Sequence, residues 1–386
     1  MRADPVPGAA HAGAAARPRV LFVQKYVPHY REPFFEALRA ALDRAGIDLA
    51  LVHGEPDRAD GARLATVSPG WALPARSRRI GVGSRTLHWI GALGHVRRGD
   101  VVVTEHAVKI LDNYPLYLLG RLGIVRFCYF GHGANFQGEG EGRITAGVRR
   151  ALVGPVERWF AYTEASRGRL LEQGIAPSRI TVVDNALADP GPREAGGEGG
   201  AGETAGPEPA RFVYAGGLYA EKRLDFLVEA GDELARRLPT FRLDVVGDGP
   251  ERGALEAAAA ERPWLRVLGA RYGESLERTV RAARAILMPG AVGLVVIDAF
   301  RAERPLVTTG AGRHGPEIAY LEHGVNGVIA GPGFDVRAYA DAVQRLVEDA
   351  PWYERLQDGC RIAAARYTLS NMVSRFVAGL ERAAGR

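Results

Sequence analysis

Short apolar runs alternate with amphipathic stretches along most of this chain, and the alternation constrains its fold more than any other feature. The run "RVLFVQKY" (19–26) is typical of a buried strand, and the stretch after it repeats large apolar residues at helical spacing. Comparable strand-and-helix pairs recur through the first half, and six more predicted strands with helices between them fill 211–349. We therefore predict an α/β fold with parallel, doubly wound sheets.

The composition changes sharply in the middle of the chain. "DPGPREAGGEGGAGETAGPEPA" (189–210) is almost entirely Gly, Pro, Glu and Ala, and cannot bury a core. A chain of 386 residues is also long enough for two domains. We predict a disordered tail (1–18), a Rossmann-like domain (19–188), a linker (189–210), a second Rossmann-like domain (211–365) and a C-terminal helix that packs back on the first domain (366–386). Ligands of such sheets bind beyond the carboxyl ends of the strands, which here would face a central cleft.

The bulk properties exclude several classes of protein. The net charge of +5 and the pI near 9.3 suit an anionic substrate, but no RNA-binding signature or zinc-finger spacing points to nucleic acid. The two cysteines, Cys128 and Cys360, are too few and too far apart for a disulfide framework or a Cys-rich metal site. The N-terminus "MRADPVPGAAHAGAAARP" has no apolar core, so we expect a tail and not a signal peptide. No run of about 18 apolar residues is present. We expect a cytoplasmic protein.

Three glycine-bearing turns follow predicted strands in the second half: "AGGLYAEKR", "VGDGPER" and "MPGAVGL". Glycine lets backbone N–H groups face an anion, and the third turn leads into a helix near Leu294 whose N-terminus favours a phosphate. Lys222 adds a mobile charge, and Arg223 is a second candidate. Each turn alone is common in α/β proteins, and a lone lysine is usually solvated. Together the three turns and the lysine predict a site for the diphosphate of a sugar nucleotide.

Four sequence blocks carry a family resemblance: "VYAGGLYAEKRLDFLVEA", "LDVVGDGPERGALEAAA", "MPGAVGLVVIDAF" and "GPEIAYLEHGVNGVIA". In order and spacing they resemble the C-terminal half of retaining glycosyltransferases of family 4, which have the GT-B fold, over about 211–347. The first half is similar more loosely, through "YVPHYREPFFEAL" and "FGHG". The resemblance implies sugar transfer from a nucleotide-diphosphate sugar with retention. No Asp-x-Asp metal signature lies near the proposed site, so we predict a transfer that needs neither a metal nor a cofactor.

The resemblance assigns donor-site roles, with two departures from the family pattern. Lys222 matches the lysine that contacts the diphosphate, but Gly217 replaces the usual arginine, and Arg223 or Arg313 would have to compensate. Asp298 replaces the second glutamate of the family pair, which holds the ribose hydroxyls. Gly290 replaces the first, which contacts the donor sugar. This second departure implies either an altered donor or sugar contacts through the backbone at Ala291 and Val292.

In the first domain, His132 matches a family histidine near the donor sugar, and its alternative is a structural turn histidine. The loop 24–31 should face the cleft, with His29 and Arg31 as candidates for donor or acceptor contact; His29 would be the base of an inverting reaction. Glu317, Glu139 and Glu141 are weaker candidates. The predicted site is catalytic His132 and Lys222; donor-binding Gly216, Gly217, Lys222, Arg223, Gly247, Gly290, Ala291, Val292, Gly293, Leu294 and Asp298; acceptor-facing His29 and Arg31; and no metal ligand.

The acceptor stays open between a saccharide, a lipid-linked saccharide and a small molecule. The basic segment 74–99, with Leu, Trp and Ile interleaved, is either a surface for an anionic membrane or an ordinary solvated helix with one buried side. The first alternative would place the protein at the inner face of the membrane, in polysaccharide or glycolipid synthesis. Three other functions remain: a natural-product glycosyltransferase, a non-catalytic nucleotide-binding protein, and another enzyme of the fold such as a sugar-nucleotide epimerase.

Overall fold

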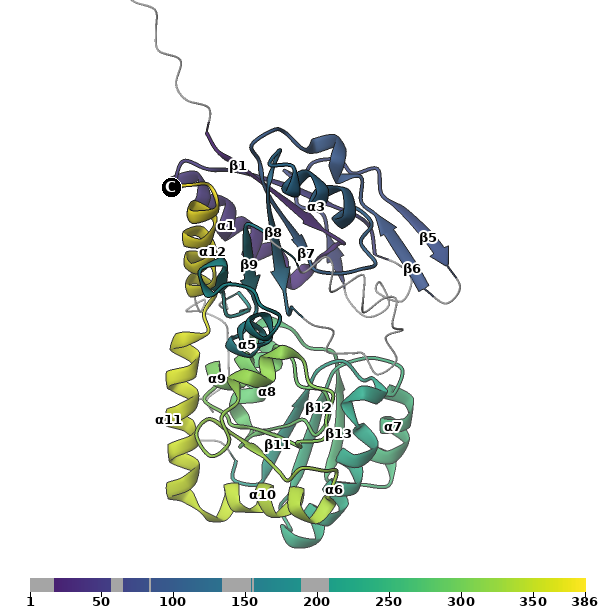
Figure 1. The fold of residues 1–386 in the computed structure, drawn as a ribbon. Coiled ribbons are helices and arrows are strands. Elements are labelled where there is room, and N and C mark those ends of the chain that lie inside the picture. The colour runs from purple at the N-terminus through teal and green to yellow at the C-terminus, as the bar shows by residue number, and fades with distance from the viewer. Residues whose placement is uncertain (1–16, 57–64, 83–84, 134–153, 155, 189–207) are drawn as a thin grey trace, which may run out of the picture.

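Two α/β domains, one above the other in Figure 1, make up the chain. The structure is a computed structural model, and it describes residues 17–56, 65–82, 85–133, 154, 156–188 and 208–386. The predicted tail and the predicted linker lie almost wholly outside these residues. Each domain is built on a parallel sheet of six strands.

The N-terminal sheet has the strand order β10-β9-β8-β7-β1-β3. In that order the strands are Ile180–Val182, Arg158–Ala161, Arg126–Gly131, Val101–Glu105, Arg19–Gln24 and Asp48–His53. Val20, Leu21, Phe22 and Val23 of β1 are fully buried, because helices cover both faces of the sheet. The helices of this domain are α1 (Glu32–Arg44), α3 (Asn113–Arg121) and α5 (Glu164–Glu172).

The C-terminal sheet has the order β13-β12-β11-β14-β15-β16. Its strands are Leu265–Gly269, Arg242–Val246, Arg211–Ala215, Ile286–Leu287, Leu306–Thr308 and Gly327–Ile329. The helices are α6 (Leu224–Arg237), α7 (Arg252–Ala260), α8 (Gly273–Ala282), α9 (Val295–Arg301) and α10 (Val336–Glu348). The predicted doubly wound α/β architecture is confirmed in both halves, and the predicted strands and helices end within a few residues of the observed ones.

The last two helices connect the domains. Helix α11 (Ala350–Arg366) contacts α9 in the C-terminal domain, and α12 (Leu369–Ala383) packs against α1, β9 and β10 of the N-terminal domain (Figure 1). The helix breaks at Tyr367 and Thr368, close to the start of the predicted C-terminal helix (366–386). The Tyr367 ring stacks on Tyr320 with centroids 3.9 Å apart, and Thr368 caps α12 by accepting from the backbone N–H of Asn371.

The basic segment 74–99 is not the solvated helix that one of its two interpretations assumed. It forms an antiparallel hairpin of β5 (Arg78–Val82) and β6 (Arg85–Trp89), followed by a short 3-10 turn. Strand β6 is also tied to the loop after β7, since His88 donates its backbone N–H to Lys109 O at 2.8 Å. The apolar residues here alternate with polar ones at a period of two, and Gly81 disfavours a helix.

The apolar core is divided by the N-terminal sheet. One cluster fills the face of this sheet under α1 and α12 and continues into the C-terminal domain. A second cluster fills the opposite face of the same sheet. Phe376 of α12 is central to the first cluster, because its ring lies within 4.6–6.1 Å of the rings of Phe22, Phe34, Phe130 and Phe160. The last helix therefore completes the core of the first domain.

Candidate functional site

The three glycine turns lie side by side at the carboxyl edge of the C-terminal sheet. They follow β11, β12 and β14, which are neighbours in the strand order. Two of the turns touch through their backbones: Leu218 donates its N–H to Asp248 O at 2.9 Å. A Cβ on Gly247 would lie 1.9 Å from Gly216 O, and both glycines have φ near +155°. The glycines at 216 and 247 are therefore required for the contact between the two loops.

Lys222 also lies at this edge of the sheet, at the end of the 3-10 turn Ala220–Lys222. Its ammonium donates to the backbone carbonyl of Ala291 and lies 3.8 Å from the sulfur of Met288. Burial lowers the pKa of Lys222 to about 8, because the surrounding protein solvates the charge less well than water. The fold thus holds a partly desolvated cation over the turn that follows β14.

The turn after β14 is packed against the backbone beside Lys222. A Cβ at Gly290 would lie 2.4 Å from Glu221 O and 2.5 Å from Lys222 O, so glycine is the residue that fits. Ala291 donates its N–H to Glu221 O at 2.9 Å. The absence of a glutamate at position 290 therefore has a structural reason: the two loops approach too closely for a side chain.

Val292 is held by a histidine that sequence reasoning missed. The Val292 N–H donates to His314 Nδ1 at 3.2 Å, and His314 Nε2 lies 2.9 Å from Thr309 O, so the neutral Nε2–H tautomer satisfies both contacts. Burial lowers the pKa of His314, which agrees with a neutral ring. The carbonyls of Ala291 and Val292 also have partners, in Lys222 and in the N–H of Gly315.

The N–H and C=O groups of Ala291 and Val292 thus each have a partner inside the protein. Sugar contacts through this backbone stay a prediction, and they would need the second lone pair of a carbonyl. In the described part of the chain, the N–H groups of Gly217, Gly293 and Leu294 have no such partner. These three donors and Lys222 are among the groups that this edge of the sheet can present to an anion.

Asp298 lies on α9, a helix of only seven residues, and is half-buried. Burial raises the pKa of its carboxyl to about 6, while Arg301 opposes the shift and Glu277 adds to it. Arg301 itself donates to the carbonyls of Leu187 and Ala188, the last described residues before the linker. The ribose-binding role of Asp298 stays a prediction.

The two arginines considered as replacements for the missing family arginine are placed differently. Arg223 pairs with Asp225 at 3.0 Å and its guanidinium lies 4.0 Å from the centre of the Phe334 ring. Its charge is thus already balanced on the outer side of α6. Arg313 is exposed, in the loop after β15. Neither arginine is therefore a better candidate for a phosphate contact than Lys222 and the backbone N–H groups of this edge.

Across from these loops, His132 follows β8, and its ring lies edge-on to Tyr162 with centroids 4.2 Å apart. Burial lowers the pKa of His132 to about 4, and the charges of Arg31 and Arg169 lower it further. The imidazole is therefore neutral near pH 7 and can offer a hydrogen bond, but no charge, to a sugar. Glu139 and Glu141 lie outside the described residues.

The two candidates of the loop 24–31 differ in exposure. His29 is exposed: its Nδ1 lies 3.2 Å from Ala65 O and its ring faces Tyr272 of the other domain at 6.1 Å. Arg31 is only 8% exposed. It lines a pocket of about 190 Å³ in the N-terminal domain, and His29 does not.

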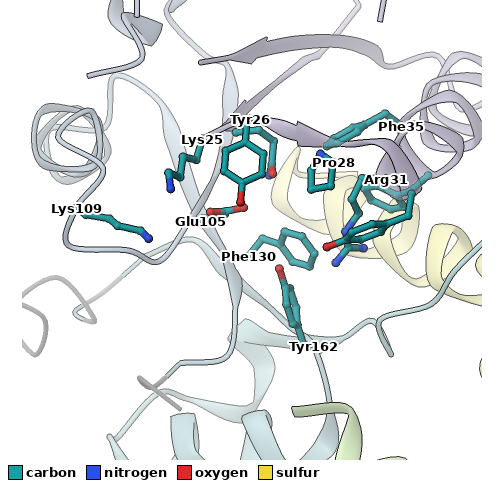
Figure 2. A pocket seen from close by; sticks show the side chains of 12 residues that line it. Lys25, Tyr26, Pro28, Arg31, Phe35, Glu105, Lys109, Phe130 and Tyr162 are labelled. Carbon is teal, nitrogen blue, oxygen red and sulfur yellow. The ribbon is translucent and has the colours of Figure 1, made fainter. Parts of the chain in front are cut away.

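Figure 2 shows this pocket, at the carboxyl ends of β1, β7 and β8. Lys25, Lys109 and Arg31 bring three cations to it, Glu105 brings a carboxylate, and aromatic rings form much of the wall. Sequence reasoning found only Arg31. A signal for two others existed: the chain has 50 lysines and arginines, of which three are lysines, and these are Lys25, Lys109 and Lys222.

The domains meet beside the pocket through a buried hydrogen bond. Asn185 Nδ2 donates to Glu317 Oε1 at 2.6 Å, and Tyr320 OH donates to Tyr162 O and Asn185 O at 3.2 Å. Burial raises the pKa of Glu317, while the Asn185 contact and the charge of Arg31 oppose the shift. Glu317 therefore lies at the junction of both domains, close to Gly315 and the turn after β14.

Residues 209–349 match the family described as glycosyl transferases group 1. The match covers most of the C-terminal domain. Within it, the glycine turns, Lys222 and Asp298 all lie on the edge of the sheet or on α9. No helix in the described ranges has both the length and the apolar surface to cross a membrane.

Known proteins similar to the chain are also glycosyltransferases. The alpha-D-kanosaminyltransferase of Streptomyces kanamyceticus is 29% identical over 168 residues, covering 41% of this chain and 42% of that protein. The 2-deoxystreptamine glucosyltransferase of the same organism is 27% identical over 263 residues, covering 62% and 66%. The chain thus spans less than half the length of the first relative.

The whole chain is similar in structure to the pneumococcal O-GlcNAc transferase GtfA in complex with UDP and GlcNAc. The TM-score is 0.63 at 11% identity, covering 95% of this chain and 99% of that one. This likeness shows the fold, which is the GT-B arrangement of two Rossmann-like domains, as the resemblance implied.

Proposed function

We propose that this chain is a glycosyltransferase that moves a sugar from a nucleotide-diphosphate sugar to an acceptor, with retention of the anomeric configuration. The observation that carries the proposal is the ammonium of Lys222, held at the carboxyl edge of a group 1 glycosyltransferase domain. The N–H groups of Gly217, Gly293 and Leu294 surround it as further donors for a diphosphate.

The chemistry requires a stabilised leaving group. As the bond between the anomeric carbon and the diphosphate oxygen breaks, negative charge grows on the diphosphate and positive charge on the sugar. Lys222 and the N–H donors stabilise the first. The leaving oxygen takes the proton of the acceptor hydroxyl while the acceptor oxygen bonds to the anomeric carbon on the same face. His132, neutral near pH 7, can hydrogen-bond the sugar.

We propose that Lys222 supplies the charge that a divalent cation supplies in many other transfers. On this account neither a metal nor another cofactor is needed. EDTA should leave the rate of transfer unchanged, and a large loss that added Mg²⁺ or Mn²⁺ restores would contradict this part of the proposal.

Two classes of acceptor have support. The relatives from Streptomyces kanamyceticus, by their names, favour a natural-product acceptor. The exposed arginines of β5, Arg78 and Arg79, would instead suit a lipid-linked saccharide at an anionic membrane, and with it a role in polysaccharide or glycolipid synthesis.

The donor is best identified first, because it can be assayed without an acceptor. The purified chain is incubated with UDP-, GDP-, ADP- and dTDP-sugars, and hydrolysis is followed by mass spectrometry. We expect one nucleotide to be released well above background, and Lys222→Met to lose most of this activity. Arg345→Met is the matched control, since Arg345 is an exposed cation of α10 in the same domain, paired with Asp349. Binding without turnover of any donor would favour the non-catalytic alternative.

A further inference from the structure

The pocket of Figure 2 is separate from the donor loops. All the residues that line it belong to the N-terminal domain, at the ends of β1, β7, β8 and β9. The donor loops belong to the C-terminal sheet. Its volume, about 190 Å³, is below the roughly 300–1,000 Å³ of pockets for drug-sized ligands. A single sugar ring with one substituent is the size of ligand that suits it.

Arg31 brings a buried charge to this pocket. Its guanidinium lies 5.7–5.9 Å from the ring centres of Tyr30, Phe34, Phe130 and Tyr162. A buried charge is costly unless it is paired, and aromatic faces compensate only part of that cost. Nη1 of Arg31 is buried without a hydrogen-bond partner. The charge of Arg31 acts on the Glu317 carboxyl, but no salt bridge between them is formed within the described ranges. The unpartnered Nη1 therefore favours a further acceptor, such as the oxygen of a bound anion.

The rest of the pocket lining also favours an anion. Nε2 of Gln24, a residue 4% exposed, is also buried without a hydrogen-bond partner. Lys25 and Lys109 add two ammonium groups, and the labelled sticks of Figure 2 show both on the same side of Glu105. Three cations against one carboxylate give the lining a net positive charge.

The positions of the lysines in the chain also point to this pocket. Arginine outnumbers lysine by more than tenfold in the chain, yet two of the three lysines line this pocket and the third is Lys222. Lysine presents a compact charge with three freely rotating donors, whereas the guanidinium is a planar fork. Such a charge can approach an anionic group from several directions.

We propose that this pocket binds an acceptor through an anionic substituent, a phosphate or a carboxylate, that Arg31 contacts and that the two lysines, on the other side of Glu105, attract through their charge. Glu105 then accepts a hydrogen bond from a hydroxyl of the same acceptor. The inference rests on the proposed transferase activity only in naming the ligand an acceptor. A polycationic aminocyclitol does not fit a lining of this charge.

The test compares glucose 6-phosphate, glucuronate and glucose as probes, by ligand-detected NMR titration of the full chain with and without saturating UDP. We expect the phosphate or the carboxylate probe to bind at least tenfold more tightly than glucose in both conditions, and the stronger of the two identifies the substituent. Arg31→Gln should remove this preference, and Lys109→Gln should reduce it about two- to fivefold. The affinity for UDP should not change. Arg39→Gln, an exposed arginine of α1 outside the pocket, is the control.

Three results would overturn the proposal: glucose binding as tightly as both anionic probes, unchanged anion binding in folded Arg31→Gln, or displacement of the anionic probes by UDP. Because Arg31 is buried, its variant may fail to fold; Lys109 is exposed, so unchanged anion binding in Lys109→Gln then decides against the proposal. A chain that binds the anionic probes but no nucleotide would refute the proposed function and leave the pocket's anion specificity standing.

Discussion

Lys222 is a buried ammonium, and its pKa of about 8 is low because burial disfavours the charged form. A bound diphosphate favours that form. Above pH 8 the free protein must therefore take up a proton to bind, so donor affinity should fall as the pH rises, by up to about tenfold per unit. Between pH 7 and the pKa of Lys222, the ammonium is mostly protonated, so it makes donor affinity depend only weakly on pH. The KM for donor hydrolysis from pH 7 to 9.5 measures this. A variant Lys222→Met that keeps the same slope would contradict the assignment.

A substitution at Gly290 tests whether the turn after β14 needs glycine to approach the backbone beside Lys222. An added Cβ would meet the carbonyls of Glu221 and Lys222, and neither backbone group can move aside cheaply. We expect Gly290→Ala to lower the free energy of unfolding by about 1–3 kcal/mol and to weaken donor binding. Gly253→Ala is the control: it lies in α7 with open space around it, and should stabilise by about 0.5–1 kcal/mol. Thermal unfolding compares the two. Equal effects would contradict the steric explanation.

Sequence alone indicated Lys222, because its turn belongs to a local motif. It did not indicate Lys25, Glu105 and Lys109, since these come from separate strand ends that only the sheet topology brings together. The use of the Ala291 and Val292 backbone inside the protein was also out of reach, because their partners lie far away in the chain.

Most strands and helices were predictable, because helical spacing of apolar residues and short buried runs are local signals. The hairpin β5–β6 was not predicted, because the many basic residues of this segment obscure its alternation of apolar and polar residues with period two.

Helix α12 provides the prediction at this scale. The Phe376 ring fills a space between four other phenylalanines of the N-terminal domain, and its nearest, Phe160, stacks on it at 4.6 Å. We expect Phe376→Ala to cost about 3–5 kcal/mol of unfolding free energy. Ile362→Ala, on the exposed face of α11, should change it by no more than about 0.5 kcal/mol. Denaturant unfolding measures both. A small effect at 376 would show that α12 is dispensable to the core.

On the scale of the whole molecule, the domains are joined by α11 and α12 and by the contact between Asn185 and Glu317. Asn185→Ala would leave the buried Glu317 carboxyl without this donor, at a cost of about 1–3 kcal/mol. Because the contact lies between the domains, transfer to an acceptor should fall more than donor hydrolysis does. Parallel assays of the two rates test this, and an equal loss in both would contradict a positioning role.

The central claim is that the C-terminal domain binds a diphosphate through Lys222, and calorimetric titration of UDP at pH 7 tests it most directly. We expect saturable binding by the wild type and by Arg345→Met, and affinity about 10- to 100-fold lower for Lys222→Met, the range that loss of a charged hydrogen bond implies. No binding of UDP or of any other nucleoside diphosphate, or equal affinity in Lys222→Met and the wild type, would contradict the account.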